Sequence, residues 1–169
     1  MQRDLKIRKA TSADLLAVVE LWKELMDFHS NLDSFFSRSL DGHKSFRSWI
    51  EKELESDSAE LFVAESSGEL LGYIKTEISN YPPVFELKKF GVISDAAVAG
   101  EYRREGIGEA LYRHAMNWFR EKDIKRVELR VADVNHVALG FWKKMGFAPY
   151  MTTMFKQTQK LICNQTGNE

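Results

Sequence analysis

Hydrophobic residues recur along the chain at two spacings, and the first is the three- and four-residue spacing of an amphipathic helix. It is plain in the run Leu15, Val18 and Trp22. Thr11, just before this run, is a residue type that caps helices, and Asp14 favours the positive end of a helix dipole. The spacing predicts helices over 11 to about 30, about 43–56, about 106–122 and 135–145.

The second spacing alternates apolar and polar residues, which is the period of a strand with one buried face. The stretch "RVELRV" is a clear case. The stretches "ELFVAES" and "ELLGYIKTE" flank Ser67 and Gly68, and turn residues between two such runs predict a hairpin. Strands are predicted over 5–10, 60–66, 69–77, 87–98 and 126–131, with a final strand or strand pair over about 147–157.

The order of these segments is β-α-α-β-β-β-α-β-α-β. Three consecutive strands predict an antiparallel meander, whereas the β-α-β step over 90–131 predicts a parallel pair with a right-handed crossover. We therefore expect an α/β (α+β) fold, with a mixed, mostly antiparallel central sheet of six to seven strands and about four helices. Where the antiparallel and parallel parts meet, splayed strands would leave unpaired backbone groups that can hold an extended ligand.

Composition indicates a soluble globular protein and excludes several classes. The 169 residues suggest a single domain over 1–158, followed by a polar tail over 159–169. The net charge of −1 argues against a nucleic-acid-binding domain, and no apolar run is long enough to cross a membrane. A single cysteine, Cys163, cannot form a disulfide or a cysteine zinc site within the chain. The charged start "MQRDLKIRKA" is unlike a signal peptide, so a cytoplasmic location is expected.

The stretch "GEYRREGIGEALYRHAM" carries the first candidate chemistry. It places Arg103, Gly106 and Gly108 between a predicted strand and a predicted helix. A helix N-terminus with glycines and arginines can seat an anion such as a phosphate. The alternative is a tight turn with solvent-facing arginines. Neither the G-x-G-x-x-G fingerprint nor a Walker A loop is present.

The segment "ISDAAVAGEYRREGIGEALYRHAM" resembles the acetyl-CoA-binding segment of the GCN5-related N-acetyltransferase (GNAT) superfamily. A second segment, "NHVALGFWKKMGF", is similar to another family segment and follows the first in the family's order, with one predicted strand between them. The resemblance is close over about 90–150 and rests on element order alone before that. It implies a GNAT-like fold, with splayed parallel strands at the cofactor site, and an acetyl-CoA co-substrate.

The resemblance also implies which residues would bind acetyl-CoA. The backbone of Ala96, Ala97 and Val98 would pair with the pantetheine arm, and Asn135 would contact the cofactor near the last helix. Asn135 equally suits a helix N-cap, and both roles are compatible. The backbone amides from Arg104 to Glu109 would hold the pyrophosphate. The further residues assigned to cofactor binding are Arg103, Arg104, Glu105, Gly106, Ile107, Gly108, Glu109 and Phe141.

The catalytic roles that the resemblance implies are a base, a polarising N–H group and an acid. Asp95 is the first candidate base, with Glu77 and Glu128 weaker ones, although Asp95 equally suits a solvated face or a loop contact. The N–H of Val98 would polarise the thioester carbonyl. Trp142 stands where the family often has a tyrosine acid; its indole N–H could stabilise the sulfur, or the ring could fill the core. Protonation would then come from Tyr102, Tyr112, Tyr150 or water.

The implied function is N-acetyltransfer from acetyl-CoA to a primary amine of a small molecule or a protein. The alternative is a non-catalytic sensor of acyl-CoA with the same fold. The stretch "HSNLDSFFSRSLDGH" mixes aromatic and acidic residues that suit a cationic acceptor, or it is a helix connection with two core phenylalanines, which is slightly favoured. Its histidines, His29 and His43, lack further ligands, so no metal is expected. The apolar stretch "YMTTMFK" suits strand pairing across a homodimer.

Overall fold

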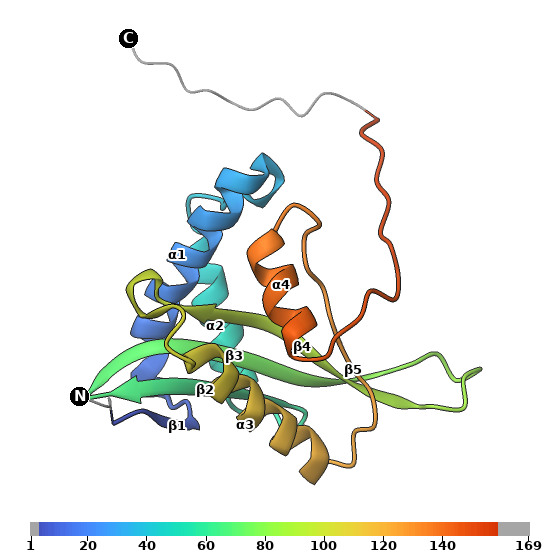
Figure 1. The fold of residues 1–169 in the computed structure, drawn as a ribbon, viewed down its shortest axis with the longest axis horizontal. Coiled ribbons are helices and arrows are strands. Elements are labelled where there is room, and N and C mark those ends of the chain that lie inside the picture. The colour runs from blue at the N-terminus through green and yellow to red at the C-terminus, as the bar shows by residue number, and fades with distance from the viewer. Residues whose placement is uncertain (1–3, 159–169) are drawn as a thin grey trace.

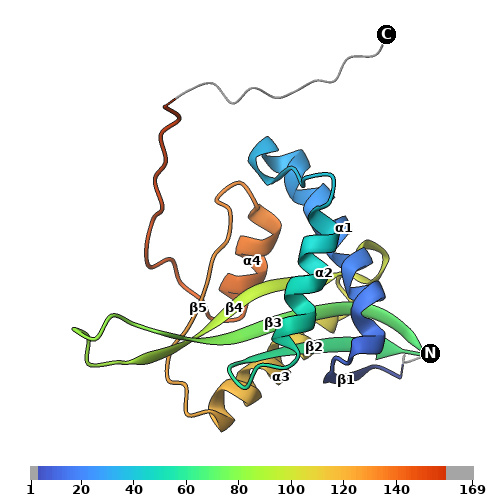
Figure 2. The same cartoon turned by 180° about the vertical axis from the view of Figure 1, so that it is seen from behind.

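A single sheet separates two clusters of buried side chains in the computed structural model, which describes residues 4–158 (Figures 1 and 2). The helices α1 and α2 cover one face of the sheet, and α3 covers the other. The elements are β1 (Lys6–Lys9), α1 (Leu15–Leu32), α2 (Gly42–Glu53), β2 (Ala59–Ser66), β3 (Glu69–Asn80), β4 (Lys89–Val98), α3 (Ile107–Glu121), β5 (Val127–Leu129) and α4 (His136–Lys144).

The sheet has the order β1-β2-β3-β4-β5, in which the first four strands are antiparallel and β5 runs parallel to β4. The predicted mixed, mostly antiparallel sheet with four helices is therefore confirmed. The hairpin between β2 and β3 is confirmed too, because Ser67 and Gly68 both have positive φ, as the tightest hairpin turns require. The helix start predicted at Thr11 and Asp14 is a short 3-10 turn over Ser12–Asp14 that leads into α1.

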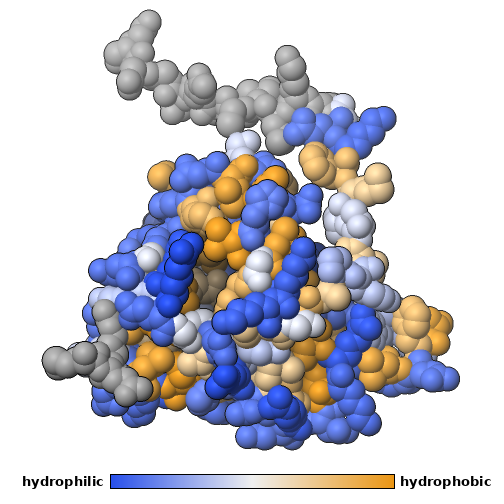
Figure 3. Space-filling view, in the orientation of Figure 1, coloured by the Kyte–Doolittle hydropathy of each residue, from blue (hydrophilic) through white to orange (hydrophobic). Residues whose placement is uncertain are grey.

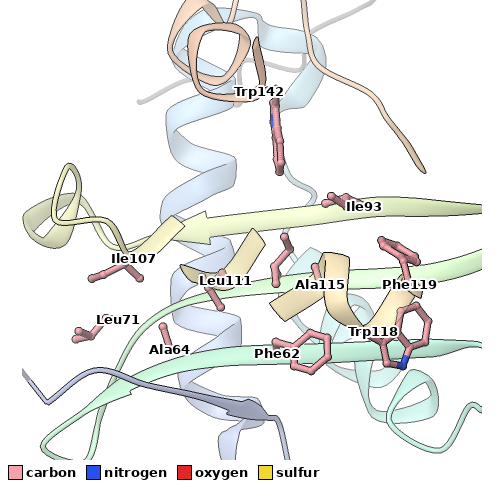
Figure 4. Close-up of a cluster of buried hydrophobic side chains, with 11 residues drawn as sticks. Phe62, Ala64, Leu71, Ile93, Ile107, Leu111, Ala115, Trp118, Phe119 and Trp142 are labelled. Carbon is pink, nitrogen blue, oxygen red and sulfur yellow. The ribbon is translucent and has the colours of Figure 1, made fainter. Parts of the chain in front are cut away.

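The core under α3 is built from side chains that the helical period predicts. Leu111, Ala115 and Phe119 of α3 are almost fully buried against Ile93 of β4. Figure 4 shows these side chains between α3 and the sheet, and it shows Trp142 of the same cluster pointing from α4 toward β4. This packing fixes α3 on the sheet, so the position of its N-terminus is fixed as well.

The expected number of six to seven strands is wrong, because the described residues form five strands. The predicted last strand over about 147–157 has no strand pairing, and this segment leaves the domain as an extended chain (Figure 1). Phe147 still packs against Trp142, but the apolar side chains from Tyr150 onward lie in solvent, and Met154 is 89% exposed. A strand requires a neighbouring strand to complete its hydrogen bonds, and none lies beside this segment in one copy of the chain.

The polar tail that the sequence predicts cannot be compared with the structure. The tail over 159–169, with Cys163, lies beyond the part of the chain that the structure describes. Of the helices within residues 4–158, none is long and apolar enough to cross a membrane.

Candidate functional site

The strands β4 and β5 pair over only three residues and then part. Their register runs from Gly91–Val127 to Ile93–Leu129, and the rest of β4 has no partner on that side within the described residues. Figure 1 shows the chain after β5 turning away to the start of α4. The predicted splay of the two parallel strands is therefore present, and it opens a gap along the last five residues of β4.

Backbone groups of β4 face this gap. The N–H of Ala99 donates to the carbonyl of Leu71 at 2.9 Å, which makes Leu71 and Ala99 a hydrogen-bonded pair between β3 and β4. Such pairs alternate along an antiparallel ladder, so the N–H and C=O groups of Ala96 and Val98 point away from β3 and toward the gap. Of the three predicted backbone contacts, Ala96 and Val98 thus lie at the gap, whereas Ala97 faces β3.

One end of the gap is closed by the N-terminus of α3. Gly106 is the N-cap residue of α3 and has φ of 86°, so no side chain caps the first N–H groups of the helix. Arg104 also has a positive φ, of 67°. Glycine adopts this conformation at little cost, whereas a residue with a side chain adopts it only where the surrounding structure holds it there. The first N–H groups of a helix have no partners within the helix, and the helix dipole adds positive charge. The backbone from Arg104 to Glu109 thus presents the N-terminus of α3, with its unpaired N–H groups, at this end of the gap.

The two sequence segments that carry the resemblance meet at this helix end. A Cβ atom on Gly108 would lie 3.3 Å from the ring of Phe141 on α4. Glu109 accepts hydrogen bonds from Lys144 at 3.3 Å and from Arg113 at 2.6 Å, and the pair with Lys144 joins α3 to α4. The pKa of Glu109 is lowered, first by the hydrogen bond from Lys144. Phe141 therefore serves the packing of α4 on α3 at this end of the gap.

The predicted arginine and acidic contacts differ in where they point. The guanidinium of Arg103 donates to the carbonyl of Val98 at 3.0 Å and to Glu24 at 3.3 Å, and it lies over the ring of Phe28. Arg103 thus braces the loop against α1. The side chain of Glu105 is exposed, whereas that of Ile107 is buried, so only the backbone of Ile107 lies at the open end of the helix.

Asn135 links the two helices that flank the gap. Its side chain accepts a hydrogen bond from the N–H of Ala138 at 3.0 Å, so the predicted N-cap is present. Its amide nitrogen lies 3.1 Å from Nε2 of His29, near the end of α1. Burial lowers the pKa of His29, which favours the neutral imidazole that can accept this hydrogen bond. Hydrophobic side chains follow the seam between α1 and α4 in Figure 3, with hydrophilic ones around it.

An irregularity in β4 turns the side chain of the candidate base, Asp95, to the face of the sheet opposite α3. The register passes from Ile93–Thr76 to Asp95–Lys75, so Ser94 is an extra residue that forms a β-bulge. Without the bulge, strict alternation would turn the side chain of residue 95 toward α3. With it, Asp95 lies on the face that α1 and α2 cover, beside Tyr73.

The environment of Asp95 changes its acidity. The hydroxyl of Tyr73 donates to Oδ2 of Asp95 at 2.8 Å. Burial raises the pKa of Asp95 to about 6, although the hydrogen bonds from Tyr73 and from the N–H of Ala96 and the charge of Lys75 oppose the rise. Burial also raises the pKa of Tyr73 well above its usual value, so Tyr73 stays a hydrogen-bond donor. A carboxylate with a pKa near 6 is ionised at neutral pH and still basic enough to accept a proton.

The weaker candidate bases lie on the same face and are engaged in ion pairs. Glu77 accepts from Lys75 at 2.5 Å, and Glu128 accepts from Arg126 at 2.7 Å and from the hydroxyl of Tyr81. Burial raises the pKa of Glu128, but the hydrogen bonds from Tyr81 and Arg126 outweigh it, so the net pKa is lowered. Glu128 therefore lacks the rise in pKa that distinguishes Asp95.

Trp142 is 9% exposed and belongs to the core cluster under α3 and α4. Its ring meets those of Tyr112, Phe141 and Phe147 in edge-to-face contacts. Figure 4 shows the indole pointing from α4 toward β4, close to Ile93, where β4 and β5 part. The ring therefore fills the space below the gap.

The three tyrosines considered as alternative acids lie in different settings. The hydroxyl of Tyr102 donates to Glu69, and that of Tyr112 donates to the carbonyl of Met145. Tyr150 is 71% exposed.

Three partners of the site were missed in the sequence: Tyr73, Lys75 and His29 in its contact with Asn135. Tyr73 and Lys75 are polar or charged residues at inward positions of a strand, which was a usable signal. The contact of His29 with Asn135 joins residues 106 positions apart and has no local signal.

Phe35, which was expected in the core, is 75% exposed. Within residues 4–158, no three metal-binding side chains gather in one group.

Comparisons with known proteins agree with this geometry. A model of the Acetyltransferase (GNAT) family matches residues 19–147. An uncharacterized N-acetyltransferase of Archaeoglobus fulgidus is 32% identical over 138 residues, which cover 82% of this chain and 89% of that protein.

Two solved structures share the fold. A tetramutant of the BH1408 protein of Bacillus halodurans matches with a TM-score of 0.82 at 22% identity, over 90% of this chain and 99% of that one. A predicted acetyltransferase of Clostridium acetobutylicum, solved with acetyl-CoA, matches with a TM-score of 0.75 at 18% identity, over 90% and 96% of the two chains.

The raised pKa of Asp95 predicts a gain in stability when its charge is removed. The folded-state pKa of about 6 exceeds the ordinary 3.8, so wild-type stability falls as pH rises from about 4 to 6. Asp95→Asn should therefore raise the free energy of unfolding at pH 8 by about 2 kcal/mol. Urea unfolding at pH 8 and pH 4 measures this, and the gain should vanish at pH 4.

A matched control is Asp27→Asn, which removes an exposed carboxylate. The hydrogen bond from Arg38 lowers the pKa of Asp27, so its removal should bring no gain at pH 8. Equal gains for both variants, or none for Asp95→Asn, would show that burial of the Asp95 charge does not cost stability.

Proposed function

Because this chain belongs to the acetyltransferase (GNAT) family, it is an acetyl-group transferase, and we propose that its acceptor is a primary amine of a small molecule or a protein. The amine attacks acetyl-CoA directly, with Asp95 as the base. The observation that carries this proposal is the position of β4. The backbone of β4 faces the gap between β4 and β5, at the edge of the strand. Because of the bulge at Ser94, the side chain of Asp95 lies on the face of the sheet that α1 and α2 cover.

The proposed seat of acetyl-CoA runs from β4 to the start of α3. The carbonyl of Ala96 and the N–H of Val98 offer the hydrogen bonds of a missing strand to the pantetheine arm and the thioester beyond it, because the N–H of Ala96 donates to Asp95 and the carbonyl of Val98 accepts from Arg103. The N–H groups from Arg104 to Glu109 bind the pyrophosphate, supported by the positive φ values at Arg104 and Gly106. Asn135 holds the other wall of the gap, tied to His29.

The proposed reaction needs a base because an alkylamine is mostly protonated at neutral pH. The carboxylate of Asp95 takes a proton from the amine, whose nitrogen then forms a bond with the acetyl carbonyl carbon. The N–H of Val98 stabilises the oxyanion that develops there. The carbon–sulfur bond breaks, the acetyl group stays on the nitrogen as an amide, and the CoA sulfur leaves as thiolate. The second proton, which the nitrogen loses as the amide forms, passes to the thiolate or to water. Trp142 offers its N–H to the sulfur rather than a transferable proton.

The proposed acceptor carries positive charge near the reacting amine. Carboxylates gather on the Asp95 face of the sheet, where Glu77 and Glu128 lie in register with Val92 between them. The stacked rings of Tyr81 and Phe90 lie beside Glu128 and add aromatic surface, which also favours a cation. A cytoplasmic location stays a prediction.

The central test is release of CoA thiol from acetyl-CoA in the presence of an amine panel. We expect amine-dependent thiol release, with an acidic limb of kcat/KM near pH 6. Asp95→Asn should lower kcat/KM by roughly 10²–10⁴ because the base is lost. Tight acetyl-CoA binding by the wild type without any amine-dependent release would instead support the non-catalytic sensor.

The anion seat is tested by two glycine variants with equal backbone strain. Gly106→Ala and Gly68→Ala both place a side chain at positive φ, with no heavy atom within 4 Å of the new Cβ. Both should lose similar stability, about 1 kcal/mol. Only Gly106→Ala should weaken acetyl-CoA binding, by about tenfold or more, in isothermal titration calorimetry. Equal affinities for the two variants would place the pyrophosphate elsewhere.

We also propose a homodimer in which residues 150–155 of each copy lie along β5 of the other. This segment exposes Met151, Met154 and Phe155 at 82%, 89% and 85%. A hollow of about 240 Å³ beside β5, lined in part by Val127 and Phe147, can receive such side chains. Light scattering after size exclusion should give twice the mass of one chain, and Met154→Asp with Phe155→Asp should give the single mass. A wild type that is monomeric at every concentration contradicts this.

A further inference from the structure

Lys75 is a charged side chain enclosed at the centre of the sheet. It is 1% exposed, on the same face of β3 as Tyr73 and Glu77. Taking an ammonium group out of water costs several kcal/mol unless the surrounding groups compensate. The chain keeps a lysine at a place where a methionine would pack, which suggests that its charge has a use.

The compensating groups come from three elements. Nζ of Lys75 lies 2.5 Å from Glu77 on β3 and 3.0 Å from Glu53 on α2. It donates to Oγ of Ser94 on β4 at 3.2 Å. It also lies 4.3 Å from the centre of the Trp49 ring. The carboxylates of Glu53 and Glu77 stay 28% and 32% exposed, so only the ammonium is fully enclosed.

This ammonium lies beside the bulge that directs Asp95. Lys75 and Asp95 are register partners on β3 and β4, and Ser94 is the extra residue of the bulge. The hydrogen bond from Lys75 to Ser94 ties the bulge to β3 from the same face on which Asp95 lies. One side chain thus contacts Ser94, the extra residue of the bulge, and its positive charge acts on the carboxylate of its register partner Asp95.

We propose that Lys75 is a positioning residue that holds Asp95 on the acceptor face and keeps its carboxylate ionised. This rests on the proposed function, in which Asp95 takes the proton of the amine. Without the ammonium, three carboxylates would share this region with no cation between them. Asp95 would then bind its proton more tightly and would lose it only at higher pH.

The other groups around Asp95 do not supply this charge. From β3 the hydroxyl of Tyr73 donates to it, and α1 packs the apolar Leu15, Val18 and Val19 into the same cluster as Tyr73 and Ala97. Other charged groups on this face are the carboxylates of Glu53, Glu77 and Glu128 and the guanidinium of Arg126, which is paired with Glu128. Arg8 also lies on this face, but it is two strands away from β3 and is paired with Asp14.

The test measures the titration of the Asp95 carboxyl carbon by NMR in the full chain. Lys75→Gln keeps a side chain that can donate hydrogen bonds and removes the charge, and Lys75→Met removes both. We expect the pKa of Asp95 to rise by about one unit or more in each neutral variant. Lys75→Arg keeps the charge and should stay near the wild type. Lys9→Gln, at an exposed lysine paired with Glu60, is the control and should change nothing.

The same variants are then assayed for amine-dependent thiol release. The acidic limb of kcat/KM should move to higher pH by the same amount as the Asp95 titration in the neutral variants, and not in Lys75→Arg. A merely structural role would lower the rate without moving this limb.

Each outcome separates this inference from the proposed function. An unchanged Asp95 titration in a folded neutral variant overturns the role of Lys75, whether or not the enzyme is active. A shifted titration with an unmoved limb supports the role of Lys75 and overturns Asp95 as the base. If neither neutral variant folds, the wild type still decides, because the Lys75 Cε signal should respond to the titration of Asp95 near pH 6. The absence of that response overturns the inference.

Discussion

The short pairing between β4 and β5 is the constraint on which the rest of this structure depends. A strand that loses its neighbour midway must find other partners for its N–H and C=O groups. After Ile93 and Leu129, the second half of β4 faces a gap rather than a strand. The packing of α3 places a helix N-terminus at one end of that gap, and Trp142 fills the space below it. In the proposed complex, the amides and phosphates of acetyl-CoA would complete what the sheet leaves open.

The same strand serves two chemistries because its backbone and its side chains point in different directions. Hydrogen-bonding groups lie in the plane of a sheet, whereas side chains stand above and below it. The backbone of Ala96 and Val98 therefore meets the gap edge-on, while Asp95 stands on the α1 and α2 face. The bulge at Ser94 decides this division, because a shift of one residue would have turned Asp95 into the core under α3. Cofactor and acceptor can thus approach one strand from two sides.

What could be predicted from the sequence was local, and what was missed was not. The helices α3 and α4, the hairpin at Ser67 and Gly68, and the N-cap at Asn135 each depend on a few neighbouring residues. The bulge at Ser94 depends on how β3 and β4 align, which no period in either strand reveals. The contacts of Lys75 join three elements that only the folded sheet brings together. The last strand over about 147–157 was predicted from a sound apolar pattern, yet such a pattern forms a strand only beside another strand.

The two ends of the proposed reaction differ in how much help they need, and the structure reflects this difference. An alkylamine has a pKa near 10, so a proton must be removed before attack, whereas a thiol has a pKa near 8.5 and its thiolate is a weak base. The sulfur can therefore leave without a strong acid beside it. The charged network around Asp95, with Tyr73 and Lys75, lies on the amine side. On the sulfur side stands Trp142, whose indole can donate a hydrogen bond but no proton. A tryptophan at this position is thus compatible with transfer, because the demanding proton is the one on nitrogen.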